Sequence, residues 1–226
     1  MSLSTSDMKR TAAQSALDEV FGLSVIGVGS GTTVDAFIDV LEEAHPPLLE
    51  GVVAASEASC ARLTAACFRV LSLTDVGGRL RLAVDGCDEA DESLRLIKGA
   101  GGAMTREKVI ASAAERFLVI GEESKLVARL GGRPVPVEVL PMAEAYVAGR
   151  LELLGGTPRR REGYVTDNGC IVLDTLGLPL EYPDTLERTL AAIPGVVGTG
   201  LFALRSADLG IFATAEGELR RFARQR

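Results

Sequence analysis

Histidine, tryptophan and paired cysteines are scarce in this 226-residue sequence. Tryptophan is absent, His45 is the one histidine, and the four cysteines form no CxxC pair. Zinc sites take their ligands mostly from histidine and cysteine, so we expect no metal here. Four unpaired cysteines also argue against the disulfide framework of a small secreted domain. No apolar run approaches the ~20 residues that a membrane-spanning helix needs.

Positive charge is in deficit as well. The sequence has 24 Lys and Arg against 31 Asp and Glu, for a net charge of -7. Nucleic acid and anionic membranes bind electropositive surfaces, so neither is expected as a partner. The N-terminus lacks the pattern of a secretory signal, and we therefore expect a cytoplasmic protein. An anionic ligand would have to be held by a local pocket.

Short apolar runs that alternate with helical periods fill the first part of the chain. The run Leu23 to Val28 leads into a glycine turn and then into a helical period from Val34 to Leu41. Similar runs follow at residues 52–55, 69–73, 80–84 and 117–120, with helical stretches at 58–66 and 103–116. This alternation predicts an α/β domain with a doubly wound, mostly parallel sheet.

From Gly131 the order of elements changes to β-α-β-β-α-β, which is the ferredoxin-like order. The hairpin is indicated by Asn168-Gly169, because both residues tolerate the positive φ of a tight turn. The predicted elements are strand 135–140, helix 142–154, strand 163–166, strand 170–174, helix 183–193 and strand 196–202. A last strand at 209–214 would return to the first sheet, followed by a short basic tail. We expect a large domain of residues 1–130 and 205–226 and a small inserted domain of residues 131–204.

Three segments carry candidate chemistry, and the first is the loop Gly27 to Thr33. Its glycines let backbone N–H groups approach an anion, and the following helix start adds the positive end of its dipole. The same pattern also suits a dinucleotide or a plain strand-to-helix connection. It has no P-loop lysine, which disfavours nucleoside triphosphate chemistry.

The second segment is the acidic loop Asp85 to Asp91, directly after an apolar strand. Parallel-sheet enzymes bind ligands beyond the carboxyl ends of their strands, so this position suits a site. A solvated turn and a Mg²⁺ site are alternative interpretations. The third segment, Lys98 to Lys108, is a glycine run that opens a helix. It offers a cation, Lys98, and a carboxylate, Glu107, although both could be surface charges.

Six stretches together resemble the type A ribose-5-phosphate isomerase family, in the family's order and over nearly the whole chain. They are AVDGCDEAD, LIKGAGGAMTREKVIASAAERF, PVPVEVLPMA, LELLGG, VTDNGCIVLDT and AIPGVVGTGLF. The resemblance implies a Rossmann-like domain with an inserted ferredoxin-like lid. It also implies an enzyme of the pentose phosphate pathway that interconverts D-ribose 5-phosphate and D-ribulose 5-phosphate, without cofactor or metal, as a homodimer or homotetramer.

Site residues follow from the same resemblance. Glu107 would be the base that moves the proton between C1 and C2, Asp85 and Asp88 would handle ring opening and the hydroxyl protons, and Lys98 would lie near the enediolate oxygens. The expected substrate-binding residues are Lys9, Ser30, Gly31, Thr32, Thr33, Asp85, Gly86, Cys87, Asp88, Lys98, Gly99, Ala100, Gly101 and Lys125.

The reaction itself suits these residue types. A carboxylate must act as the base, because His45 lies in an unrelated Ala-His-Pro-Pro turn. Lys98 and the N–H groups of residues 99–102 would form an oxyanion site before the reaction starts. A catalytically silent sugar-phosphate sensor and an NAD-dependent oxidoreductase are the alternatives.

Three positions depart from the family pattern, and one arginine run has no assigned role. Cys87 and Ala100 replace an alanine and a glycine, and Leu204 replaces an asparagine, which leaves the contacts around it open. The run Arg159 to Arg161 is interpreted as a solvated face of the small domain, with a subunit contact as the alternative.

Overall fold

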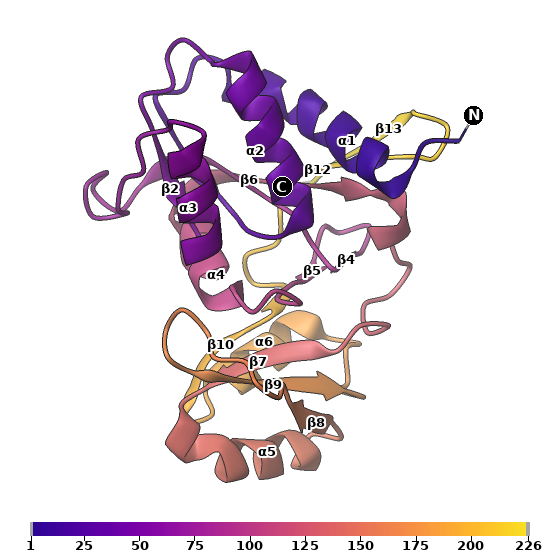
Figure 1. Cartoon of the computed structure of the whole chain (residues 1–226). Helices are drawn as coiled ribbons and strands as arrows, with labels where there is room; N and C mark the ends of the chain where they lie inside the picture. Colours follow the sequence, from indigo (N-terminus) through magenta and orange to yellow (C-terminus); the bar gives the residue numbers. More distant parts are fainter. Residues whose placement is uncertain (1, 225–226) are drawn as a thin grey trace. The chain divides into compact units, whose positions relative to one another are not determined.

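The computed structural model describes residues 2–224, which divide into two compact units (Figure 1). The first unit contains the chain up to Cys87, then Arg106–Leu126, and the chain from Ala207 onward. The second contains Asp88–Thr105 and Val127–Ser206. The predicted boundaries at 131 and 204 differ from this grouping for residues 88–105, and an independently folding small domain of 131–204 stays a prediction.

A six-stranded sheet in the order β13-β12-β6-β3-β1-β2 forms the centre of the first unit. Neighbouring strands from β12 to β2 all run parallel, whereas β13 pairs antiparallel with β12. This confirms the predicted mostly parallel sheet and the return of the chain to it. The strands are β1 (Val25–Val28), β2 (Gly51–Ala54), β3 (Leu80–Asp85), β6 (Ala114–Glu122), β12 (Leu209–Ala213) and β13 (Leu219–Ala223).

Helices cover both faces of this sheet, as a doubly wound fold requires. Helices α1 (Thr5–Val20) and α2 (Thr32–Ala44) lie side by side on one face (Figure 1), where they bury Ile26 and Val28 of β1. Gly27 points to the other face, where Ile110 of α4 (Met104–Ala113) fills the space that a side chain would take. Helix α3 (Glu57–Ala65) packs beside β2.

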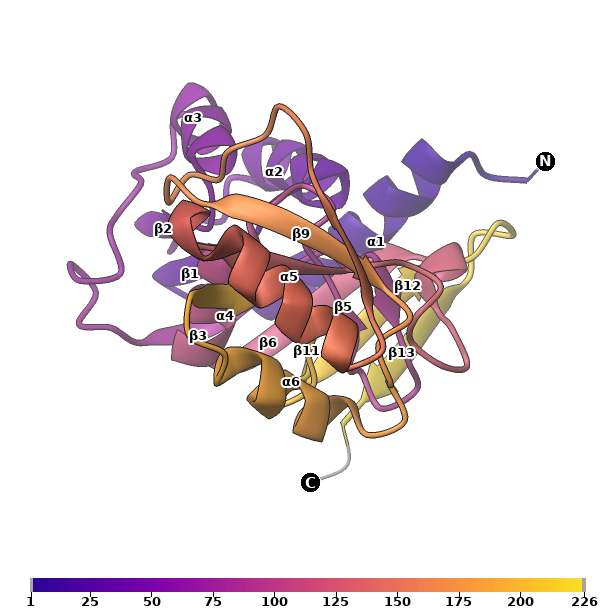
Figure 2. The same cartoon turned by 90° about the horizontal axis from the view of Figure 1, so that it is seen from below.

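The second unit has the predicted β-α-β-β-α-β order. Its antiparallel sheet runs β10-β7-β9-β8, and α5 and α6 lie on one face of it (Figure 2), over a core of alternate residues of β7 such as Val137. The elements are β7 (Val135–Val139), α5 (Glu144–Leu153), β8 (Thr157–Arg160), β9 (Ile171–Leu176), α6 (Pro183–Ala191) and β10 (Val196–Thr199). The ferredoxin-like fold is thereby confirmed.

A small antiparallel sheet, which was not predicted, also belongs to the second unit. It joins β11 (Leu201–Phe202), β5 (Leu96–Ile97) and β4 (Glu89–Ala90). The buried carboxylate of Glu89 accepts hydrogen bonds from the N–H groups of Gly131 at 2.7 Å and Arg133 at 2.5 Å. This carboxylate fixes the start of the ferredoxin-like segment to the residues around Lys98.

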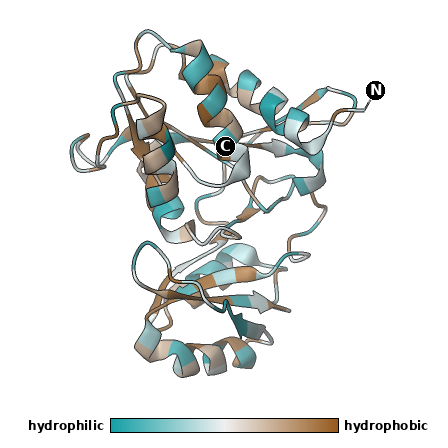
Figure 3. Ribbon diagram, in the orientation of Figure 1, coloured by the Kyte–Doolittle hydropathy of each residue, from teal (hydrophilic) through white to brown (hydrophobic). Residues whose placement is uncertain are grey.

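Five predicted elements are wrong in their bounds or kind. The strand expected at 69–73 is only a single parallel bridge between Val70 and Val52. The strand expected at 196–202 divides into β10 and β11, which belong to different sheets. The strand expected at 163–166 lies at β8, whose hydrophilic residues (teal in Figure 3) at the sheet edge hide the alternating pattern. The helix expected to reach Arg116 ends at Ala113, because the chain continues directly into β6. The basic tail is strand β13, which a turn at Gly217 brings back against β12. Within residues 2–224 no helix is long and apolar enough to cross a membrane.

Candidate active site

The loop between β1 and α2 combines an open helix start with a lysine. Gly31, at φ +94°, turns the chain into α2, and no side chain caps the first N–H groups of this helix. Uncapped N–H groups at a helix start are a common anion site. Lys9 of α1 donates a hydrogen bond to Thr32 Oγ1 at 2.8 Å. The structure therefore brings Lys9 to the loop, as predicted from the sequence.

Asp85 ends β3 and faces the same loop. Its buried carboxylate accepts hydrogen bonds through Oδ1 from the N–H groups of Ser30 at 3.2 Å and Gly86 at 2.7 Å. The Asp85 side chain lies so close to Gly29 that a Cβ on Gly29 would be 1.9 Å from Asp85 Cγ. Two of the predicted segments, the glycine loop and the acidic loop, thus meet at the carboxyl edge of the sheet.

Three serine hydroxyls form a chain of hydrogen bonds that ends on the backbone of the loop Gly27 to Thr33. Ser59 Oγ donates to the Gly29 carbonyl at 2.7 Å, Ser56 Oγ donates to Ser59 Oγ at 3.0 Å, and Ser30 Oγ lies 3.0 Å from Ser56 Oγ. Each hydroxyl has a single proton, so Ser30 must be the donor to Ser56. The Ser30 oxygen is then left with lone pairs only, so it can act as an acceptor.

Sequence reasoning missed this support. Ser56 caps α3, and its Oγ accepts the N–H of Ser59 at 3.0 Å. A Ser-x-x-Ser spacing before a helix is a capping signal that could have identified the pair. The signal says nothing of Gly29, because that contact is 30 residues away in sequence.

Lys125 lies at the end of β6, which is parallel to β3. It belongs to the short helix η1 (Glu123–Lys125), and its Nζ is 3.6 Å from Oε1 of the buried Glu122. The carboxyl ends of parallel strands share one edge of a sheet, so Lys125 adds positive charge at the edge where Asp85 lies.

Glu107 occupies the first turn of α4, where the helix dipole favours negative charge. Its side chain is buried, with 5% exposed. The preceding residue, Arg106, forms an ion pair of 2.8 Å with Glu57 at the start of α3. Burial of this carboxylate separates Glu107 from ordinary surface charges.

The predicted residues of the second unit form a compact group. Asp88 accepts the Ala100 N–H through Oδ2 at 2.9 Å, and its own N–H donates to the Ile97 carbonyl at 2.8 Å. Lys98 is 2% exposed, its N–H donates to the Gly200 carbonyl at 2.8 Å, and its Nζ lies 5.7 Å from the centre of the Phe202 ring. The loop at residues 99–101 thus holds the Asp88 carboxylate beside the Lys98 backbone.

Two departures from the family pattern are accommodated by the backbone. Ala100 is not among the residues with positive φ, so its position does not need a glycine. The N–H groups of Ala203 and Leu204 donate to Glu187 Oε2 at 2.7 and 2.8 Å, which fixes this stretch without the side chain at 204. Cys87 is partly buried.

The interpretation of Arg161 as a solvated residue is wrong. Its guanidinium forms an ion pair with Asp174 at 2.6 Å and hydrogen bonds with the carbonyls of Gly99 and Ala100, and its side chain is 19% exposed. Arg159 and Arg160 are exposed, as predicted. Among residues 2–224 no group of three or more His, Cys, Asp or Glu suits a metal ion.

Comparison with known proteins gives one family. The family model described as ribose 5-phosphate isomerase A (phosphoriboisomerase A) matches residues 51–217. The chain is 49% identical to the ribose-5-phosphate isomerase A of Bordetella bronchiseptica over 227 residues, which cover 99% of each chain.

Solved structures agree over the full length. The ribose 5 phosphate isomerase A of Neisseria gonorrhoeae superposes with a TM-score of 0.96 at 37% identity, with all of both chains covered. A D-ribose-5-phosphate isomerase in complex with phospho-erythronic acid gives a TM-score of 0.92 at 34% identity, covering 98% of this chain and 100% of that one.

Proposed function

The chain belongs to the ribose 5-phosphate isomerase A family, and on that basis we propose that it interconverts D-ribose 5-phosphate and D-ribulose 5-phosphate with Glu107 as the general base. The full-length match at 49% identity is the observation that carries the activity of an aldose–ketose isomerase. The alternative is a catalytically silent regulatory protein. It is not favoured, because the matching family model and the relatives named above are all ribose-5-phosphate isomerases.

The reaction needs one base and a store for negative charge. In the open-chain aldose, the Glu107 carboxylate takes the proton from C2, and the C2–H electrons form the C1=C2 bond of an enediolate. The carbonyl π electrons move to O1, which carries the charge. Return of a proton to C1 and transfer of the O2 hydroxyl proton to O1 complete the ketose. Atoms and electrons balance, and the carboxylate is regenerated.

The roles of the aspartates follow from the family resemblance and their hydrogen bonds. We assign Asp85 and Asp88 to opening of the sugar ring and to the movement of hydroxyl protons. Asp85 Oδ1 is engaged by two N–H groups, and Asp88 Oδ2 by one. These hydrogen bonds hold each carboxylate in one orientation, from which it can act on a hydroxyl group of the sugar.

Lys98 is assigned to the enediolate oxygens. Its burial means that its ammonium group is weakly hydrated, so it can act on a developing oxyanion without a large reorganisation of water. The backbone N–H groups of the adjacent glycine loop would supplement it.

The phosphate group is assigned to the start of α2, with Lys9, Thr32, Thr33 and Lys125. The uncapped N–H groups and the two lysines supply donors and charge. Ser30, whose hydroxyl proton is directed to Ser56, would contribute through its backbone or as an acceptor. Cytoplasmic location and homo-oligomeric assembly stay predictions.

The test is the fate of deuterium at C2 of ribose 5-phosphate, with and without a chelator. We expect the wild-type chain to remove the label from C2 at the same rate in both conditions. The variant Glu107→Gln should fold normally and lose about 10² to 10⁴ in turnover, the usual contribution of a general base. Glu115→Gln, which changes an exposed carboxylate paired with Arg81, is the matched control.

Turnover within a few-fold of wild type in Glu107→Gln would reassign the base to another carboxylate. Loss of turnover on addition of chelator would contradict the metal-free reaction. No turnover by the wild-type chain would contradict the proposed function as a whole.

A further inference from the structure

Side chains from the connection between β8 and β9 form hydrogen bonds with three consecutive carbonyls, those of residues 99–101, which are called the glycine loop from here on. Arg161 donates through Nη2 to the Gly99 carbonyl at 3.2 Å and through Nη1 to the Ala100 carbonyl at 3.0 Å. Tyr164 Oη donates to the Gly101 carbonyl at 2.8 Å. All these residues belong to the second unit.

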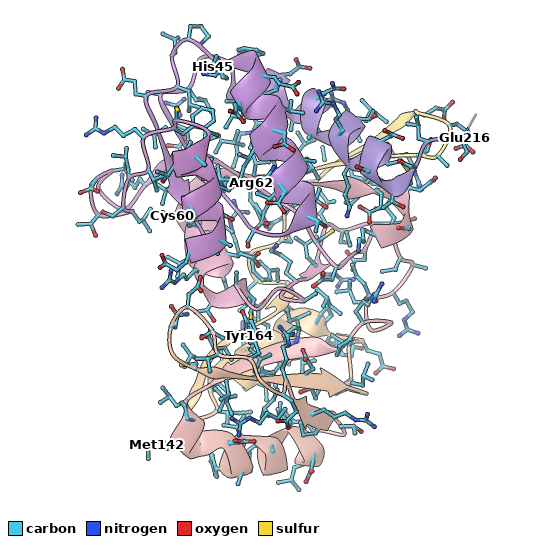
Figure 4. The ribbon with its side chains drawn as sticks, viewed as in Figure 1. His45, Cys60, Arg62, Met142, Tyr164 and Glu216 are labelled. Carbon is cyan, nitrogen blue, oxygen red and sulfur yellow. The ribbon has the colours of Figure 1, made fainter. Side chains whose placement is uncertain are left out.

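The guanidinium of Arg161 is itself fixed on two sides. Asp174 of β9 accepts Nη2 at 2.6 Å and Nε at 2.9 Å, which is the bidentate pairing that orients an arginine most strictly. The Tyr164 ring stacks on it, with the guanidinium carbon 5.3 Å from the ring centre. Tyr164 itself is labelled in Figure 4. The guanidinium of Arg161 is thus held in one orientation toward the carbonyls of Gly99 and Ala100.

The segment that carries Tyr164 is anchored as well. Glu138 of β7 is fully buried and accepts Thr166 Oγ1 at 2.5 Å and Asn168 Nδ2 at 3.1 Å. The N–H of Gly169 closes the turn on the Thr166 carbonyl at 2.8 Å. This anchor makes the connection a rigid support for the glycine loop.

Each carbonyl belongs to a peptide whose N–H points the opposite way, because the peptide bond is planar and trans. The peptide of the Gly99 carbonyl presents the Ala100 N–H, which donates to Asp88 Oδ2 at 2.9 Å. The peptide of the Ala100 carbonyl presents the Gly101 N–H. Among the described residues we find no acceptor for this N–H, and Gly101 is exposed.

We propose that Arg161 is a positioning residue of the active site, which acts through these two peptides on Asp88 and on the Gly101 N–H. A cation bonded to a carbonyl polarises the peptide and strengthens the N–H at its other end as a donor. The Gly101 N–H then stabilises the negative charge of the enediolate, so this inference rests on the proposed function. Asp174 keeps the guanidinium in place, and Tyr164 fixes the next peptide.

The neighbouring residue Arg160, at the end of β8, has different contacts from Arg161. Its guanidinium pairs with Glu144 of α5 at 2.8 Å, and its side chain is 45% exposed. Among the described residues no hydrogen bond or ion pair links Arg160 to the loop at residues 99–101. Arg160→Gln therefore removes the same charge at the adjacent position without changing a group assigned to the reaction, and it is the matched control.

The experiment compares Arg161→Gln, Arg161→Lys, Tyr164→Phe and Arg160→Gln with the wild-type chain. Measurements are kcat and KM for ribose 5-phosphate, calorimetric binding of phospho-erythronic acid, whose carboxylate resembles the enediolate, and the thermal midpoint. We expect Arg161→Gln to lower kcat by about 10- to 100-fold, somewhat less than loss of an oxyanion donor itself, with KM within about threefold.

The conservative variants refine the expected pattern. Arg161→Lys keeps the charge but not the fork that spans two carbonyls, so it should recover only part of kcat. Tyr164→Phe should lower kcat by a few-fold. Inhibitor binding should weaken in the order of the kcat losses, and Arg160→Gln should match wild type in kcat and in inhibitor binding.

A purely structural role predicts a different result. If Arg161→Gln lowers the thermal midpoint but leaves kcat and inhibitor binding of the folded protein unchanged, the inference is overturned. Should Arg161→Gln not fold, unchanged kcat in both Arg161→Lys and Tyr164→Phe overturns it. If the wild-type chain shows no turnover, the proposed function fails, and the inhibitor titration still decides whether Arg161 acts on the loop.

Discussion

The Ser30 N–H donates a hydrogen bond of 3.2 Å to Asp85 Oδ1, although the two residues are 55 positions apart in sequence. This bond joins the loop after β1 to the end of β3, and so links the proposed phosphate-binding loop to a carboxylate assigned to proton movement. Both residues lie in the first unit, within a framework of buried strands. Substitutions that disturb this framework should therefore change the activity of the site.

Gly29→Ala should disturb Asp85 directly. The new Cβ would lie 1.9 Å from Asp85 Cγ, so the carboxylate or the loop must move. We expect a loss of about 1 to 3 kcal/mol in the free energy of unfolding, as for other overpacked sites, and at least a tenfold loss in kcat. Gly149→Ala, in α5 with nothing within 4 Å of the new Cβ, is the control. It should keep full activity, and equal behaviour of the two variants would refute the close approach.

Ser59→Ala should loosen the loop Gly27 to Thr33, although we assign Ser59 no contact with the substrate. The Gly29 carbonyl would lose its donor, and Ser56 would lose its acceptor. Unsatisfied buried groups cost about 1 to 3 kcal/mol, which denaturant unfolding would measure. We also expect a higher KM for ribose 5-phosphate with a smaller change in kcat. Thr64→Ala, on the exposed side of the same helix, should change neither. A fall in kcat at constant KM would argue against a phosphate-side role.

Glu89→Gln should weaken the attachment of residues 131–133. The carboxylate accepts two backbone N–H groups, whereas the amide NH₂ of glutamine would face one of them as a second donor. We expect the free energy of unfolding to fall by about 1 to 3 kcal/mol. Hydrogen exchange at the amides of Gly131 and Arg133 should accelerate relative to the control Glu92→Gln, which changes an exposed side chain. Unchanged exchange at both amides would count against this anchor.

Cys170 should resist alkylation in the folded protein. Burial raises the pKa of the Cys170 thiol from its ordinary value of 9.0, and the charge of Glu138 raises it further. Iodoacetamide at pH 8 should therefore modify the exposed Cys67 well before Cys170, as read by peptide mass mapping. Because the folded pKa is raised, the contribution to stability is complete below the unfolded pKa and is lost as pH rises through the folded pKa. Equal alkylation rates of Cys67 and Cys170 at pH 8 would contradict this.

Local sequence patterns were enough to predict the order and kind of most elements. An apolar run before a glycine turn marked β1, a second apolar run marked β3, helical periods marked α2 and α5, and Asn168-Gly169 marked a turn. These signals are local, because periodicity and turn chemistry depend on residues a few positions apart. The candidate residues came from short motifs and from the family resemblance, and the structure places Lys9, one of the latter, in a hydrogen bond with Thr32.

The backbone and side-chain groups that hold those residues in place come from segments far apart in the chain, and local patterns did not reveal them. The bond from Ser59 to Gly29 spans 30 positions, and the bonds from Arg161 to Gly99 and Ala100 span 62 and 61. Arg161 was predicted to be solvated, but its guanidinium is held in place because Asp174 and two carbonyls accept its hydrogen bonds. Hydrogen bonds of this range follow from chain topology, and neither composition nor local spacing contains them.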